Sequence, residues 1–185
     1  MIDLQSKITE QLQLILGADQ QSPLCVAFSG GLDSSVLLHA LVQQSGHRPL
    51  RALHINHQLQ DSADDWQAHC QRFCSAHDIA FQALAVETES FSGLGLEGAA
   101  RAARYQAFAE NLAAGESLLT AHHADDQVET MILALVRGSG ALGLSACATQ
   151  RSLGQGQLLR PLLDVSRQQL REYAEQHQLS WIEDP

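Results

Sequence analysis

Apolar and polar residues follow one another along the chain in short blocks that change repeatedly from one period to another. Ile8, Leu12, Ile15 and Leu16 are apolar at helical spacing, which predicts an amphipathic helix near the N-terminus. Short apolar runs bounded by glycine, proline or polar residues predict four buried strands, at 24–28, 50–55, 79–86 and 118–121. Helical patterns follow at 34–42, from Asp61 or Ser62 to about His77, and at 96–113, 125–137 and 166–177.

Strands that alternate with helices are typical of a parallel sheet covered on both faces. We therefore predict the α/β class, with a doubly wound, mostly parallel sheet and helices on both faces. No repeat or proline-rich linker divides the chain, so residues 1–185 are expected to form a single domain. Ligands of such sheets bind at the carboxyl ends of the strands. Polar clusters follow three predicted strands, at 29–35, 54–57 and 122–126.

Composition narrows the class of protein. No run approaches the roughly 20 apolar residues of a membrane span, and the N-terminus lacks an export signal, so we expect a cytoplasmic protein without a membrane partner. The four cysteines are expected to be reduced thiols. Eleven Lys and Arg against 21 Asp and Glu give a formal charge of −10. If RNA is the substrate, its basic binding surface must come largely from outside this domain.

The sequence SGGLDS at 29–34 lies between a predicted strand and a predicted helix. Backbone N–H groups and the hydroxyls of Ser29 and Ser34 at a helix N-terminus can bind phosphate, and Gly30 and Gly31 allow close backbone approach. Asp33 is a candidate Mg²⁺ ligand. No lysine precedes Ser34, which argues against a Walker A loop. Without a ligand, the segment would be a Gly-Gly turn that starts a helix.

Charged side chains elsewhere are candidates for the rest of a site. Asp126 and Glu129 lie three residues apart on a predicted helix and form either an acidic pocket or a solvated helix face. Arg101 and Arg104 are candidates for binding a triphosphate or an RNA backbone, with ordinary surface arginines as the alternative. Three further residues could bind a ligand or be structural: Arg137, at a predicted helix C-terminus, and His54 and His57, after a strand.

Two groupings imitate metal sites. His122 and His123 precede a pair of aspartates, but adjacent histidines at a strand end point in different directions. Cys70 and Cys74 have histidines nearby on the same predicted helix, and we expect them to pack in a core.

The SGGLDS motif resembles the pyrophosphate-binding loop of the N-type ATP pyrophosphatases, or PP-loop superfamily. Further segments resemble the tRNA(Ile)-lysidine synthetase family within it. These are HINH at 54–57, EGAAR at 97–101 with Arg104 and Tyr105, TAHHADDQVET at 120–130 with RGSG at 137–140, LRPLL at 159–163 and WIED at 181–184. The resemblance covers about residues 24–185 and implies an adenine nucleotide alpha hydrolase-like fold.

The resemblance implies a ligase that joins lysine to the wobble cytidine of a minor isoleucine tRNA with a CAU anticodon. ATP and Mg²⁺ would adenylate the base, and L-lysine would then displace AMP. The nucleotide would contact residues 29–34, His54 and Arg101, and Asp33 would be linked to the metal. Asp126 and Glu129 would bind the lysine ammonium. Arg104 and Arg137 are further substrate-binding candidates.

Other interpretations follow from the same motifs. The chain is expected to stop before C-terminal tRNA-binding domains, and its oligomeric state is open, with a homodimer as one option. A thiolase of the same superfamily is one alternative, although no Cys-x-x-Cys motif occurs. A non-catalytic nucleotide-binding module is the other.

Overall fold

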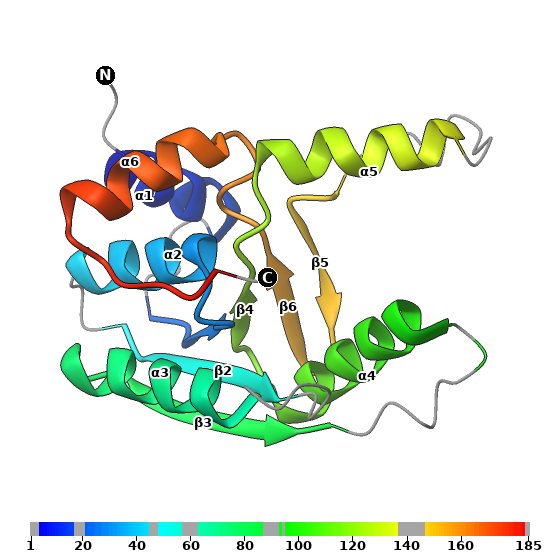
Figure 1. Cartoon of the computed structure of the whole chain (residues 1–185), viewed down its shortest axis with the longest axis horizontal. Helices are drawn as coiled ribbons and strands as arrows, with labels where there is room; N and C mark the ends of the chain where they lie inside the picture. Colours follow the sequence, from blue (N-terminus) through cyan, green and yellow to red (C-terminus); the bar gives the residue numbers. More distant parts are fainter. Residues whose placement is uncertain are drawn as a thin grey trace.

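The computed structural model describes residues 4–16, 21–44, 48–56, 63–86, 93, 95–136 and 147–183. Helices and strands alternate along most of this part of the chain (Figure 1). The helices are α1 (Leu4–Leu16), α2 (Leu32–Gln43), α3 (Ala63–Ala76), α4 (Gly95–Asn111), α5 (Ala124–Val136) and α6 (Arg167–Gln176). The strands are β1 (Leu24–Ala27), β2 (Leu50–Asn56), β3 (Ala80–Ala85), β4 (Ser117–Leu119), β5 (Gln150–Leu153) and β6 (Gly156–Leu159).

The strands form one sheet in the order β3-β2-β1-β4-β6-β5. All neighbours are parallel except β5, which is antiparallel to β6. The chain winds outward from β1 through β2 to β3, then returns to the other side of β1 to form β4. Because crossovers between parallel strands are right-handed, this reversal places α4 on the opposite face from α2 and α3. The predicted doubly wound, mostly parallel sheet is confirmed.

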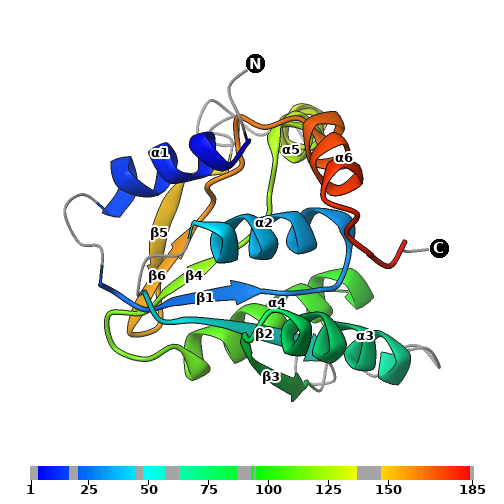
Figure 2. The same ribbon diagram turned by 90° about the vertical axis from the view of Figure 1, so that its left-hand side faces the viewer.

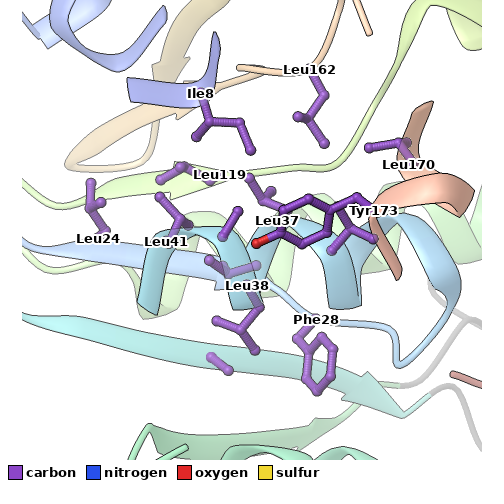
Figure 3. Packing of buried hydrophobic residues seen from close by; sticks show 14 of the residues in the cluster. Ile8, Leu24, Phe28, Leu37, Leu38, Leu41, Leu119, Leu162, Leu170 and Tyr173 are labelled. Carbon is purple, nitrogen blue, oxygen red and sulfur yellow. The ribbon is translucent and has the colours of Figure 1, made fainter. Parts of the chain in front are cut away.

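Side chains of the strands alternate between two apolar layers. Leu24 and Val26 belong to the layer covered by α1, α2, α3 and α6, whereas Cys25 packs with Phe108 and Leu112 in the layer at α4. Figure 2 shows α2 and α4 on opposite sides of β1. Figure 3 shows the leucines of α2 interlocked with side chains from α1, β4 and α6 in the first layer. Burial on both faces explains why β1 reads as a continuous apolar run in the sequence.

The β5–β6 hairpin is the element that the sequence pattern did not reveal. Three of the four residues of β5 are polar and exposed, so the strand has no apolar run. Gly154, with φ +56°, begins the two-residue turn between the strands, and a Cβ there would collide with the backbone of Ala109 on α4. The hairpin therefore lies tightly against α4. The predicted cap at Asp61 or Ser62 falls outside the described residues.

α5 differs from the other helices because none of its described side chains is buried. Its large apolar side chains between Val128 and Val136 are 44% to 80% exposed. Figure 1 shows α5 extending away from the layer formed by α1, α2 and α6. Within the described residues, no helix has the length and apolar character needed to cross a membrane.

The cysteines have the state expected from the sequence. Cys25, Cys70, Cys74 and Cys147 are free thiols, and the first three are fully buried. Burial raises the pKa of Cys70 to about 12, so this thiol stays protonated. The part of the chain that the structure describes contains no cluster of three His, Cys, Asp or Glu residues suited to a metal ion. Packing of Cys70 and Cys74 in the core is confirmed.

A buried ion pair ties the amino ends of the strands together. Arg51 of β2 donates to Glu116, just before β4, through Nε at 2.7 Å and Nη2 at 2.8 Å. Glu116 also accepts the amide of Ala113 at 3.0 Å. Burial alone would raise the pKa of Glu116, but the hydrogen bonds from Arg51 and Ala113 outweigh it and hold this pKa below its usual value. The pair therefore fixes the turn before β4.

A histidine cluster joins α2, α3 and α6 on the other side of the molecule. His39 is 6% exposed, its Nδ1 lies 3.0 Å from the hydroxyl of Tyr173, and its ring contacts His77 and His177. Burial lowers the pKa of His39 to about 4, and the neighbouring His177 and His77 add to this effect. His39 is therefore neutral at physiological pH.

Replacing Glu116 by glutamine should lower the free energy of unfolding by about 2–3 kcal/mol, because Arg51 then stays partly buried without its carboxylate. Denaturant titration at neutral pH measures the change. Glu172→Gln removes an exposed carboxylate on α6 and should cost less than about 0.5 kcal/mol. Equal losses in the two variants would contradict a special role for the buried pair.

The histidine cluster should make stability fall in mild acid. In the unfolded chain His39 binds a proton near pH 6.5, but in the folded protein only near pH 4, so unfolding takes up a proton between these values. The contribution of neutral His39 to the free energy of unfolding is complete above pH 6.5 and is lost as the pH falls from 6.5 to about 4. His39→Gln, which can still hydrogen-bond Tyr173, should reduce the acid-induced loss by about 1–2 kcal/mol in denaturant titrations. Parallel pH curves for the two proteins would refute this.

Candidate functional site

A cavity of about 540 Å³ opens at the carboxyl ends of β1, β2 and β4. This volume suits a small-molecule ligand. Residues from all three of the predicted polar clusters line it. Its lining includes Ser29, Gly31, Asp33 and Ser34 after β1, His54 and Asn56 at the end of β2, Thr120 and His122 after β4, Asp126 on α5, Trp66 on α3, and Arg104, Tyr105 and Phe108 on α4.

The loop after β1 is shaped to expose backbone amides. Gly30 has φ +85°, a conformation that favours glycine, and Gly31 starts α2 without a side-chain cap. The hydroxyl of Ser34 donates to the carbonyl of Gly31 at 3.1 Å and lies 3.0 Å from the hydroxyl of Ser29. The amides of the first turn of α2 are thus left for an anion, which the helix dipole also favours.

Core side chains hold this loop from behind. A Cβ on Gly30 would lie 2.8 Å from the Cys70 sulfur, which is closer than packing allows. The amide of Ile182 donates to the carbonyl of Gly30 at 2.9 Å, so the segment after α6 fastens the loop as well. The loop therefore has little room to change shape when a ligand binds.

His54 lies beneath the loop and lines the cavity at the same time. It is 4% exposed, its Nδ1 donates to the carbonyl of Phe28 at 2.8 Å, and the Cys70 sulfur is 3.6 Å from the same nitrogen. Burial lowers the pKa of His54, which keeps the ring neutral. His54 thus supports the loop and also lines the cavity, and its contact with a nucleotide stays a prediction.

His123 connects the loop to the start of α5. Its Nε2 lies 3.5 Å from Oδ2 of Asp33 and 3.6 Å from Oδ2 of Asp126, and its Nδ1 lies 3.5 Å from Asp125. The Asp33 carboxylate raises the pKa of His123 most, against burial, and the other two carboxylates add to the effect. Asp126 also accepts the His123 amide at 2.8 Å. The imidazole thus holds two pocket carboxylates near each other.

His122 has the opposite surroundings. Its Nδ1 lies 2.9 Å from the Thr120 hydroxyl, and its ring faces the cavity. Burial lowers the pKa of His122 to about 4, and the positive charges of Arg160, Arg101 and Arg104 contribute, while Asp126 opposes them. His122 is therefore a neutral polar group on the cationic side of the pocket.

The structure brings many of the predicted site residues together. Ser29, Gly31, Asp33, Ser34, His54, Arg104 and Asp126 line the cavity, and the buried Gly30 and Leu32 support the loop from within. Arg101 and Glu129 are exposed and do not line the cavity. Arg137 and His57 fall outside the described residues. Asp125 instead accepts the amide of Arg167 at 2.9 Å, which joins the starts of α5 and α6.

Several lining residues carried no signal in the sequence. Trp66 and Phe108 form apolar walls from α3 and α4, and their positions resemble ordinary core positions on amphipathic helices. The sequence indicated only a metal-ligand role for His123. It did not show that this ring lies at Asp33 and Asp126 while its neighbour His122 faces the cavity. Tyr105 directly follows Arg104 and lies four residues after Arg101. This spacing and the family resemblance at 97–105 were the available clues.

The residues at the loop fit a magnesium ion in part. Oδ1 of Asp33 is buried and has no hydrogen-bond partner among the described residues, which is the state of a carboxylate oxygen available to a hard cation. Magnesium commonly takes one or two protein carboxylates and completes its shell with water and substrate phosphates. Asp33, on the loop after β1, is consistent with that arrangement.

Relatives of known name share this chain's sequence. The tRNA(Ile)-lysidine synthase of Serratia proteamaculans is 57% identical over 182 residues, which cover 97% of this chain and 41% of that protein. The protein of the same name from Alkalilimnicola ehrlichii is 55% identical over 166 residues, covering 89% of this chain and 37% of that protein. The chain therefore spans about two fifths of the length of these curated relatives.

A solved structure supports the fold. The U34-tRNA thiolase NcsA from Methanococcus maripaludis, solved with its 4Fe-4S cluster, has a TM-score of 0.72 and 18% identity, covering 97% of this chain and 66% of that chain. At this identity the likeness concerns the fold alone. The family model for the PP-loop domain matches residues 4–185. Because this match covers almost the whole chain, including the loop at 29–34 and the residues that line the cavity, the chain belongs to the PP-loop domain family.

Proposed function

We propose that residues 1–185 form the adenylating domain of a tRNA(Ile)-lysidine synthase, acting in the cytoplasm on a minor isoleucine tRNA with a CAU anticodon. The observation that carries the proposal is the approach of Asp33, on the phosphate loop, and Asp126, on α5, to the same ring nitrogen of His123. A site for ATP and a site for an ammonium group therefore adjoin within one cavity. The names of the most similar relatives support this assignment.

ATP would bind with its phosphates at the loop after β1. The amides that begin α2 and the hydroxyls of Ser29 and Ser34 would donate to phosphate oxygens. When bound, Mg²⁺ would neutralise charge on the phosphates, and Asp33 is the residue that would hold it. Trp66 and Phe108 offer apolar surface for the adenine or the target base. The contact of Arg101 with the triphosphate, implied by the family resemblance, stays a prediction.

The reaction proceeds in two steps. The oxygen on carbon 2 of the cytosine attacks the α-phosphorus, and the bond to pyrophosphate breaks. The amine of lysine then attacks carbon 2, its proton is released, and AMP leaves with that oxygen. Asp126 would hold the ammonium group of lysine before attack, with Glu129 one turn further along α5. Catalysis rests mainly on positioning and on neutralising the charge of the leaving groups.

RNA recognition would be shared with parts of the protein outside these residues. The formal charge of −10 leaves little basic surface for a whole tRNA. We therefore propose that further RNA-binding modules hold the tRNA body, while this domain receives the anticodon base. A single-stranded loop makes it inexpensive to draw one base out of its stack.

Replacing Asp126 by asparagine should raise the KM for lysine about 10- to 100-fold and change the KM for ATP much less, because the variant loses the charge that would pair with the ammonium group but keeps the amides of the loop after β1. Asparagine can still accept the His123 amide, so the start of α5 is preserved. The assay measures transfer of labelled lysine by the full-length protein to an isoleucine tRNA transcript with a CAU anticodon. Glu172→Gln serves as the matched control.

Three results would count against the proposal. Lysine transfer with an unchanged KM in Asp126→Asn would remove Asp126 from the lysine site. Sulfur-dependent modification of the same tRNA would favour a thiolase. ATP binding without release of pyrophosphate for any acceptor would favour a non-catalytic nucleotide-binding module.

Gly30→Ala should weaken ATP binding about tenfold or more, because alanine at φ +85° is strained and its Cβ meets the Cys70 sulfur. Equilibrium dialysis with ATP measures the effect. Gly93→Ala is the matched control, since a Cβ there meets no atom of the described residues within 4 Å. Adding Cys70→Ala to Gly30→Ala removes the collision but leaves the backbone strain, so it should restore only part of the affinity. Full affinity in Gly30→Ala would show that the loop tolerates another shape.

A further inference from the structure

Three guanidinium groups surround one aromatic ring at the rim of the cavity. The Cζ atoms of Arg101, Arg104 and Arg151 lie 5.2, 5.9 and 4.8 Å from the ring centre of Tyr105. Arg101, Arg104 and Tyr105 come from α4, whereas Arg151 comes from β5, the strand at the edge of the sheet. Two elements far apart in the sequence thus place like charges together. We call Arg101, Arg104, Arg151 and Tyr105 the arginine cluster.

The described carboxylates do not neutralise the cluster. Acidic side chains outnumber basic ones 21 to 11 in the chain, yet among the side chains that the structure describes, which exclude that of Glu97, none lies in ion-pair contact with these three arginines. Burial lowers the pKa of Arg104, although Tyr105 opposes this effect, and Arg101 lowers it further. Gathering cations without carboxylates is unfavourable unless an anion completes the site. The arrangement therefore points to an anionic ligand.

A fourth arginine extends the positive charge inward. Arg160 is 6% exposed, its Nη1 donates to the carbonyl of Ala148 at 2.5 Å, and its buried Nε has no hydrogen-bond partner in the part of the chain that the structure describes. Burial is the main cause that lowers the pKa of His122 in the cavity wall, and the charge of Arg160, with those of Arg101 and Arg104, lowers it further. Positive charge thus runs from the interior of the site to its outer rim.

The position of the cluster distinguishes between possible anions. Arg104 and Tyr105 line the cavity, but Arg101 and Arg151 do not. The loop at Ser29 to Ser34 already supplies amides and hydroxyls for the phosphates of a nucleotide inside the cavity. A ligand that occupies the cavity and also reaches the exposed Arg151 must continue beyond the rim, as a polynucleotide does.

We propose that the arginine cluster binds the phosphodiester backbone of RNA next to the nucleotide that enters the cavity, with Arg151 as the outermost contact. This inference rests on the proposed function, because it takes RNA as the substrate. Guanidinium groups form paired hydrogen bonds to phosphate oxygens. Tyr105 packs edge-on against the buried Phe108, at 6.2 Å and 88°, so its ring is a fixed platform that orients the three arginines.

The test measures binding of the isoleucine tRNA transcript to the full-length protein by filter retention, without ATP or lysine. Arg151→Ala should weaken binding about 3- to 10-fold and reduce the slope of log K against log salt by about 0.7, the value for one contact to a single strand. Arg151→Lys keeps the charge but loses the planar contact, so its tRNA affinity should lie between those of the parent and of Arg151→Ala. Arg72→Ala, an exposed arginine on α3 across the sheet, is the matched control and should bind like the parent.

A second variant tests the platform. Tyr105→Leu retains all three arginines but removes the ring that orients them, so it should weaken tRNA binding with little change in the salt slope. Denaturant titration of each variant checks that the fold is intact.

The outcomes separate this inference from the proposed function. Unchanged tRNA affinity in Arg151→Ala would overturn the inference, and so would a loss of ATP affinity with tRNA binding intact, which would assign the cluster to the nucleotide. If tRNA binding depends on Arg151 while lysine is not transferred, the RNA site stands and the lysine reaction is rejected.

Discussion

The change in winding direction between β1 and β4 is the constraint from which the site follows. Because the crossover helices that flank this point lie on opposite faces of the sheet, neither covers the carboxyl ends of the two strands, and a crevice opens there. The polar segments after β1 and β4 and the polar residues at the end of β2 face this crevice. Its apolar walls likewise come from both layers, with Trp66 from α3 and Phe108 from α4. A sheet wound in one direction only would leave these residues far apart.

The two adjacent histidines after β4 lie in surroundings of opposite charge. His123 turns toward Asp33, Asp125 and Asp126, which raise its pKa, whereas burial and nearby arginines lower the pKa of His122 to about 4. Alternation along an extended chain accounts for the opposite directions of the rings. One side of the cavity is therefore acidic and suits an ammonium group, and the other is cationic and suits the phosphodiester backbone of an RNA. Two unlike substrates can thus occupy one small cavity without competing for the same charges.

The sequence predicted elements well where burial shaped the pattern. β1 to β4 are covered on both faces or packed against helices, so their apolar runs were visible, and the loop at Ser29 to Ser34 was recognisable from its glycines and serines. β5 was not predictable, because an edge strand with polar, exposed residues has no apolar period. Arg151 was missed for the same reason. Spacing on a helix grouped Asp126 with Glu129, but only the fold shows that Asp126 alone reaches the cavity.

The net charge of this domain is a poor guide to where an RNA strand could bind, because binding depends on the electrostatic potential close to the contact surface. Charges on the solvent-exposed surface are screened over about 8–10 Å at physiological salt, so carboxylates on the far face of the sheet hardly weaken the potential at the arginine cluster. Asp64 and Asp65 of α3, for example, lie across the sheet from α4. An RNA strand that approached those surfaces would meet like charge, whereas at the rim beside Tyr105 it meets three guanidiniums. For an RNA strand, the rim beside Tyr105 is therefore a more favourable surface to approach than the start of α3.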